Sequence, residues 1–215
     1  MDWNQWSDEW RAQYRGKPYA WHQEQTRAIL AAHPNQEGFD YEFFRQCIDA
    51  IPDAKISVME FGGWRGGLAM QAIAGDSRIE RWLNIEVTDI ARENAECDSP
   101  RYSCYVPSDF VWNTPQLADH TVFVSSHAIE HITREHLHAL LDWIPAGVQY
   151  LWLQAPLPED ETNNTWPYYG GTHILEDGWK QVIEFLQPTH TLIGRGGIRN
   201  ECLFFARNVT QALIG

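Results

Sequence analysis

From residue 55 onward, short apolar segments alternate with segments whose apolar residues recur every three or four positions. The first pattern is typical of buried strands and the second of amphipathic helices. We predict strands at 55–61, 81–87, 102–106, 121–126, 148–154, 189–193 and 201–206, and helices at 66–74, 90–96, 133–144 and 177–186. Such alternation favours an α/β fold with a mostly parallel sheet and helices on both of its faces.

The first 54 residues have a different pattern, with aromatic and aliphatic residues at helical spacing and no strand-like run. The residues at this spacing are Trp3, Trp6 and Trp10, followed by Phe44, Cys47, Ile48 and Ile51. We therefore expect a helical cap over residues 1–54, packed on a domain formed by residues 55–215, the two making one compact unit.

The charge balance is strongly acidic. The chain has 215 residues, with 16 Lys plus Arg against 29 Asp plus Glu and a formal net charge of -13. Because no cluster of basic residues offsets this excess, it argues against a nucleic-acid partner. The four cysteines lack CxxC spacing and are expected to be reduced thiols. Without an apolar leader or a membrane-length run, we expect a cytoplasmic protein with no membrane partner.

The stretch from Glu60 to Gly67, EFGGWRGG, places four glycines directly after the first predicted strand. Glycine permits positive φ and lets a ligand approach the main chain, and the following helix start offers free N–H groups. Neither a dinucleotide fingerprint nor a P-loop fits, because Trp64 takes the place of a required glycine and Leu68 follows where a lysine is needed.

This segment resembles the first motif of class I S-adenosylmethionine-dependent methyltransferases, which is acid-x-Gly-x-Gly-x-Gly. Glu60, Gly62 and Gly66 match the motif, whereas Trp64 stands at the middle glycine and Gly63 just before it. The resemblance implies a Rossmann-like seven-stranded, mostly parallel sheet with an antiparallel last strand, and S-adenosylmethionine as cofactor. The glycines would then make room for the methionine part and the sulfonium of the cofactor.

The resemblance also implies the rest of the cofactor site. Glu86, after the second strand, would hold the ribose hydroxyls, and Asp109 with Phe110 would contact adenine. The expected cofactor-binding residues are Glu60, Gly62, Gly63, Gly66, Glu86, Asp109, Phe110 and Ser126. Alternatives remain for the acids, since Glu60 could cap the helix or pair with Arg65, and Glu86 and Asp109 could be solvated turn residues.

The acceptor is expected to be a small organic molecule, although a protein side chain is also compatible with the sequence. The connection over residues 155–172 is a candidate substrate loop, because long loops after strands are often functional. A disordered excursion is the alternative. The loop is rich in aromatic residues, namely Trp166, Tyr168 and Tyr169.

Three histidines fall near the expected carboxyl ends of the strands, and histidine titrates near neutral pH. We predict His127 as the first candidate for a catalytic base and His173 as the second, because each follows a strand or its loop. His131 is expected to have a structural role. Proton removal from a hydroxyl acceptor would assist the in-line transfer of the methyl group.

Two other functions fit the same residues. His127, Glu130 and His131 form H-x-x-E-H, a zinc hydrolase motif that requires both histidines on one helix. A strand runs directly into this segment, which argues against that reading. A methyltransferase fold that binds without catalysis is the other alternative, because Trp64 departs from the glycine pattern.

Overall fold

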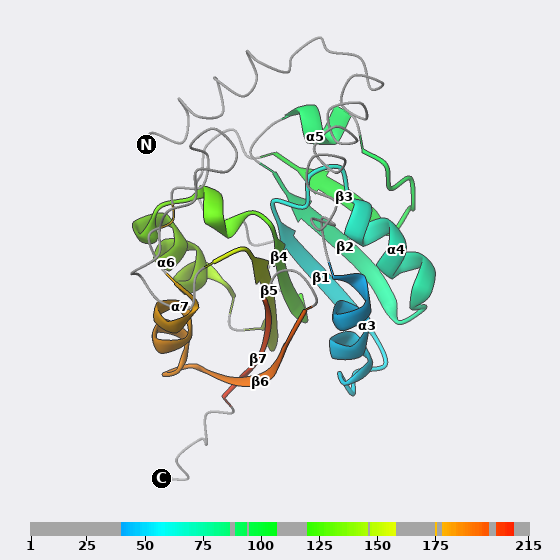
Figure 1. Cartoon of the computed structure of the whole chain (residues 1–215). Coiled ribbons are helices and arrows are strands. Elements are labelled where there is room, and N and C mark those ends of the chain that lie inside the picture. The colour runs from blue at the N-terminus through cyan, green and yellow to red at the C-terminus, as the bar shows by residue number, and fades with distance from the viewer. Residues whose placement is uncertain are drawn as a thin grey trace, which may run out of the picture.

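The protein is described here by a computed structural model that covers residues 40–86, 89–93, 95–106, 120–145, 147–157, 175, 178–197 and 201–208 (Figure 1). Several predictions concern residues outside these ranges. They are the helical spacing of Trp3, Trp6 and Trp10, the adenine contacts of Asp109 and Phe110, the base His173, and the loop aromatics Trp166, Tyr168 and Tyr169.

A seven-stranded sheet forms the centre of the fold, with the strand order β3-β2-β1-β4-β5-β7-β6. Neighbours among β1 to β5 pair in parallel, and β7 is antiparallel to both β5 and β6. The strands are β1 Ile56–Phe61, β2 Ile79–Ile85, β3 Tyr102–Tyr105, β4 Val122–Ser126, β5 Tyr150–Ala155, β6 His190–Gly196 and β7 Glu201–Arg207. The predicted fold class, including the antiparallel last strand, is confirmed.

Helices cover both faces of the sheet (Figure 1). On one face lie α3 (Tyr41–Asp49) and α4 (Gly67–Gly75), and on the other lie α6 (Arg134–Trp143) and α7 (Trp179–Leu186). The shorter elements are α5 (Asp89–Glu93) and the 3-10 helix η2 (Ile129–His131). The buried apolar residues form two clusters, one with α6 and α7 and one with α3 and α4. Both faces of the sheet are therefore buried, which explains the continuous apolar runs of its strands.

The start of α3 lies at the carboxyl end of the parallel strands. Asp40 caps the helix by accepting a hydrogen bond from the N–H of Phe43, and the N–H of Asp40 itself donates to Gln154 Oε1 at the end of β5 (3.2 Å). Farther along the helix, the ring of Phe44 packs edge-on against Trp152 with 5.2 Å between ring centroids. The helix thus spans the sheet face from the carboxyl edge downward.

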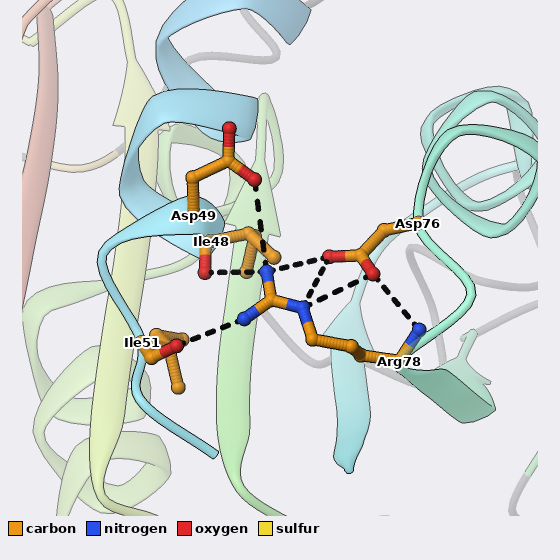
Figure 2. A network of polar contacts seen from close by, with 5 residues as sticks. All are labelled: Ile48, Asp49, Ile51, Asp76 and Arg78. Carbon is orange, nitrogen blue, oxygen red and sulfur yellow. Dashed lines mark hydrogen bonds and ion pairs between the residues drawn. The ribbon is translucent and has the colours of Figure 1, made fainter. Parts of the chain in front are cut away.

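Arg78 fastens the other end of α3 to the turn between α4 and β2 (Figure 2). Its guanidinium donates to the main-chain oxygens of Ile51 (2.9 Å) and Ile48 (3.1 Å), and it pairs with Asp76 (2.7 Å). A weaker ion pair joins it to Asp49 at 3.6 Å. The last carbonyls of a helix have no partner within the helix, so this side chain supplies the donors that they require.

Two glycines of the predicted β6–β7 link belong to β6 in the structure. A Cβ atom at Gly196 would lie 2.6 Å from Cε2 of Phe43, and one at Gly194 would lie 3.2 Å from Cβ of Phe204. The glycines thus make room for the ring of Phe43 on the sheet. The sequence suggested a turn because glycine is common in turns, and a packing demand of this kind has no local signature.

All four cysteines are free, and Cys47, Cys97 and Cys202 are buried. Burial, together with the negative charge of Asp40, raises the pKa of the Cys47 thiol to about 12. Among the described helices, none combines the length and the apolarity needed to cross a bilayer.

Candidate functional site

The loop that leaves β1 turns sharply at three residues with positive φ, which are Gly62 (70°), Trp64 (50°) and Gly66 (81°). The N–H of Gly62 donates to the main-chain oxygen of Ile85 on β2 (2.9 Å), and the N–H of Gly66 donates to that of Gly63 (2.9 Å). Gly66 then serves as the N-cap of α4. The predicted strand–glycine loop–helix arrangement is therefore present at the carboxyl end of β1.

Two side chains at the end of β2 hold this loop. Asn84 accepts a hydrogen bond from the N–H of Gly63 (3.0 Å) and donates to the main-chain oxygen of Trp64 (2.9 Å). Glu86 accepts the N–H of Trp64. Asn84 is fully buried and Glu86 nearly so. The parallel register of β1 and β2 places Asn84 opposite Glu60, which brings both groups under the loop.

The glycines of the loop are needed for close packing against other parts of the protein. An added Cβ would lie 2.3 Å from Cβ of Ala128 at Gly62, 2.2 Å from the Glu60 carboxylate at Gly63, and 2.8 Å from the Tyr102 ring at Gly66. Atoms this close would have to move. The structure thus gives these glycines a reason within the protein, apart from the room for a cofactor expected from the sequence.

Glu60 lies beneath the loop and is 1% exposed. Its carboxylate accepts a hydrogen bond from Nε1 of Trp82 on β2 (2.8 Å). Burial raises the pKa of Glu60 to about 7, although the Trp82 hydrogen bond acts in the opposite direction. It does not cap α4, which has no side-chain cap, and the ion pair of Arg65 is with Glu96 (2.5 Å). Glu60 therefore supports the loop from below.

The carboxyl end of β4 forms the second half of the candidate site. The hydroxyl of Ser126 donates to Gln154 Oε1 (2.9 Å), and the N–H of His127 donates to the main-chain oxygen of Gln154 (2.9 Å). His127 has a positive φ of 53°. Because Ala128 packs against Gly62, this corner touches the loop after β1. Gln154 thus joins the ends of β4 and β5 to the start of α3.

Glu130 follows in the 3-10 helix η2, and its side chain is 3% exposed. Its Oε1 lies 3.4 Å from Nδ1 of His127 and 4.0 Å from Nε2 of His131, and its buried Oε2 has no hydrogen-bond partner. Burial alone would raise the pKa of Glu130. The hydrogen bond from His127 and the charges of the two histidines outweigh burial, so the pKa is lowered and the carboxylate is charged at neutral pH.

The geometry of this segment is not that of an H-x-x-E-H zinc helix. β4 ends at Ser126, His127 is left-handed, and only residues 129–131 are helical. The two histidines therefore do not share one face of an α-helix. Within the described residues, no group of three or more His, Cys, Asp or Glu side chains is placed to hold a metal ion.

Of the predicted site residues, the structure brings Glu60, the loop glycines and Glu86 together at β1 and β2, and Ser126 and His127 together at β4. The sequence did not point to Asn84, Gln154 or Tyr102, which bind or cover these segments. A polar residue inside an otherwise apolar strand is a usable signal for the first two, because a buried amide needs partners.

No model of a known protein family matches the sequence, and no curated protein matches it. Many solved structures match the fold. One is the methyltransferase domain of bacterial CtHen1, with 15% identity over 77% of this chain and 96% of that one, and a TM-score of 0.57. Another is TrmK of M. capricolum in complex with S-adenosyl-homocysteine, with 8% identity, 80% and 70% coverage and a TM-score of 0.53.

A third is the ribosomal protein L11 methylase of Lactobacillus delbrueckii subsp. bulgaricus, with 12% identity over 80% of this chain and 81% of that one, and a TM-score of 0.52. At these identities the comparisons establish the fold, and the fold is that of methyltransferases with a Rossmann-like sheet.

The comparisons correct the prediction about partners. A small-molecule acceptor was expected and nucleic acid was considered improbable, yet the similar structures include the small RNA methyltransferase HEN1 and the ribosomal protein L11 methylase. Net charge describes the whole surface, whereas an acceptor is bound at one local part of it. The acidic balance therefore does not determine the acceptor class for this fold.

Proposed function

We propose that this chain is an S-adenosylmethionine-dependent methyltransferase that binds its cofactor where β1 and β2 end. The observation that carries the proposal is the pairing of the Gly62–Gly66 loop with Glu86 at the carboxyl edge of the sheet. In open α/β sheets, ligands bind in the crevice beyond the carboxyl ends of the strands. The shared fold with methyltransferases supports the same assignment.

The residues present fit an adenosyl group. A carboxylate has about four acceptor positions, so the hydrogen bond from Trp64 to Glu86 leaves capacity for the hydroxyls of a ribose. Gly63 and Trp64 have their N–H groups bound by Asn84 and Glu86, so the loop keeps one shape. Loop shape and the Glu86 carboxylate are therefore the two features on which cofactor affinity should depend.

When bound, the cofactor would supply a methyl carbon activated by positive sulfur, and the protein would align the acceptor with it. We infer that the acceptor is a macromolecule, RNA or protein, which the comparisons support. The transfer of labelled methyl groups from S-adenosylmethionine to separate pools of RNA and protein distinguishes the two. Label that appears in neither pool, and only in small molecules, would overturn this part of the proposal.

Calorimetry with S-adenosylmethionine and S-adenosyl-homocysteine tests the cofactor directly. Glu86→Gln keeps an acceptor for Trp64 but loses the charge, so binding should weaken by about 1–3 kcal/mol, the usual contribution of hydrogen bonds to a charged group. Glu80→Gln on the same strand removes an exposed pair with Lys55 and should leave the affinity unchanged. No binding by the folded wild type, or equal affinity in both variants, would refute the proposal.

A catalytically inactive binding protein is the second candidate, favoured by the departure at Trp64. Tight binding of both ligands with no methyl transfer to either pool would support it.

A further inference from the structure

The corner after β4 contains a buried carboxylate for which neither the fold nor the cofactor site accounts. Glu130 is 2% exposed, and Oε2 has no hydrogen-bond partner. A buried ionised carboxylate is costly unless it is paired, so its partners should indicate why it is there. Its closest printed partner is Nδ1 of His127 at 3.4 Å.

The contact with His127 fixes which ring nitrogen carries a proton. A carboxylate can only accept hydrogen bonds, so Nδ1 must be the donor, and Nε2 of a neutral ring then keeps its lone pair. Nε2 of His131 lies at 4.0 Å, which is beyond hydrogen-bond distance. Glu130 therefore orients His127 specifically, and His131 contributes its charge.

The pair presents His127 to the surroundings of the loop. The side chain of His127 is 28% exposed, whereas that of Glu130 is 3% exposed, so the accessible part of the pair belongs to the histidine. The positive φ of His127 is unusual for a residue with a side chain, and such strain often marks functional positions. The next residue, Ala128, contacts Gly62 of the glycine loop.

The main chain holds the corner in place as well. The N–H of His127 donates to the oxygen of Gln154 on β5, and the main-chain oxygen of Glu130 accepts the N–H of Leu175, which is buried. Three separate segments thus meet at this pair. The geometry is that of a base whose ring is oriented by a buried acid.

We propose that Glu130 is a positioning residue that holds His127 as the Nδ1–H tautomer, so that Nε2 removes a proton from the methyl acceptor. This rests on the proposed methyl transfer. In the step, the acceptor's O or N forms a bond to the methyl carbon and the carbon–sulfur bond breaks, its electron pair staying on sulfur. The acceptor's proton goes to Nε2, and the resulting imidazolium is paired with Glu130.

The tautomer can be read without any substrate. Long-range proton–nitrogen spectra of chain labelled with ¹⁵N-histidine, at about pH 8 where an ordinary histidine is neutral, report which ring nitrogen carries the proton. Signals are assigned to His127 by their loss in His127→Gln. We expect the Nδ1–H form to be favoured by about tenfold or more, as a charge-assisted hydrogen bond implies, and Glu130→Gln to lose this preference.

The control is Glu135→Gln, an exposed position at the start of α6, which should keep the wild-type tautomer. With an acceptor in hand, Glu130→Gln should lower turnover by about 10²-fold, the lower end for a general base, with the affinity for S-adenosylmethionine changed less than about twofold. Parallel losses of turnover and affinity would indicate a merely structural role and overturn the inference.

The wild-type spectrum alone keeps the inference falsifiable if Glu130→Gln does not fold. An Nε2–H tautomer of His127 would overturn it. So would one equivalent of zinc that Glu130→Gln releases, because the carboxylate would then serve a metal. An Nδ1–H tautomer in a chain that binds no S-adenosylmethionine would support the pair and refute the proposed function instead.

Discussion

Replacing Glu60 by glutamine tests whether the carboxyl beneath the glycine loop is as deeply desolvated as its 1% exposure indicates. Burial raises the pKa of Glu60 from 4.5 to about 7, while Trp82 Nε1 donates to it at 2.8 Å. The unfolded chain loses this proton near the ordinary value. Between pH 4.5 and 7 the folded state therefore binds more protons than the unfolded state, and the free energy of unfolding falls as the pH rises.

The magnitude follows from the size of the pKa difference. Each pH unit between the folded and unfolded values is worth about 1.4 kcal/mol, so ionisation of Glu60 should remove about 3 kcal/mol of stability across this window. Below the window both states hold the proton, and above it both have lost it, so the contribution of Glu60 is constant there. Glutamine keeps an acceptor for Trp82 and has no proton to lose.

Urea unfolding of the wild type and of Glu60→Gln at a series of pH values provides the measurement. The difference between the two removes the contributions of the other acids, which add independently when they are distant. Relative to the wild type, the variant should gain about 3 kcal/mol between the acidic and the neutral end.

Glu80→Gln is the control on the neighbouring strand. Glu80 is about half exposed and paired with an exposed Lys55, so its difference from the wild type should stay within about 0.5 kcal/mol at every pH. A flat difference for Glu60→Gln would refute the reasoning, because it would mean that the folded and unfolded states release this proton at the same pH.

Two further predictions concern packing and polar contacts. Arg78→Ala should cost about 2–3 kcal/mol of unfolding free energy in urea, since it leaves two helix-end carbonyls unpaired, whereas Arg45→Ala, in an exposed pair, should cost less than about 0.5 kcal/mol. Equal losses would contradict the tie drawn in Figure 2. Gly62→Ala should cost about 3 kcal/mol, and adding Ala128→Gly should recover the steric part and leave about 1–2 kcal/mol for the positive φ. A double variant no more stable than Gly62→Ala would exclude the clash with Ala128.

The fold could be predicted from the sequence because its physical causes are local. Parallel strands buried on both faces appear as apolar runs, and the helices between them show their period. The capping of α6 by Thr133, whose side chain accepts the N–H of His136, follows the same logic and is confirmed. Boundaries moved by one to three residues, as for β2, which begins at Ile79 where the strand was expected from Arg81.

The site was only partly predictable, for a reason that Gln154 illustrates. Its side chain accepts from Ser126 on β4 and from Asp40 before α3, two residues distant in sequence. Local spacing cannot indicate such partners, because they depend on strand order and on where a helix starts. Glu86 was placed correctly at the end of β2, but its contact with the loop depends on the register of β1 and β2, which the sequence leaves open.

The departure from the glycine pattern at Trp64 has a physical explanation in this loop. Trp64 has a φ of 50°, a conformation that costs a residue with a side chain about 1–2 kcal/mol and glycine almost nothing. Gly63 does not have a positive φ, and it must be glycine because the Glu60 carboxylate and Asn84 Oδ1 occupy the space of a Cβ. The glycine one position early therefore meets a different demand and does not replace the missing one. Asn84 and Glu86 hold the loop at Trp64 through its main-chain N–H and C=O, so its shape does not depend on the tryptophan side chain. A tryptophan at this position is thus compatible with the loop geometry on which the proposed cofactor site rests.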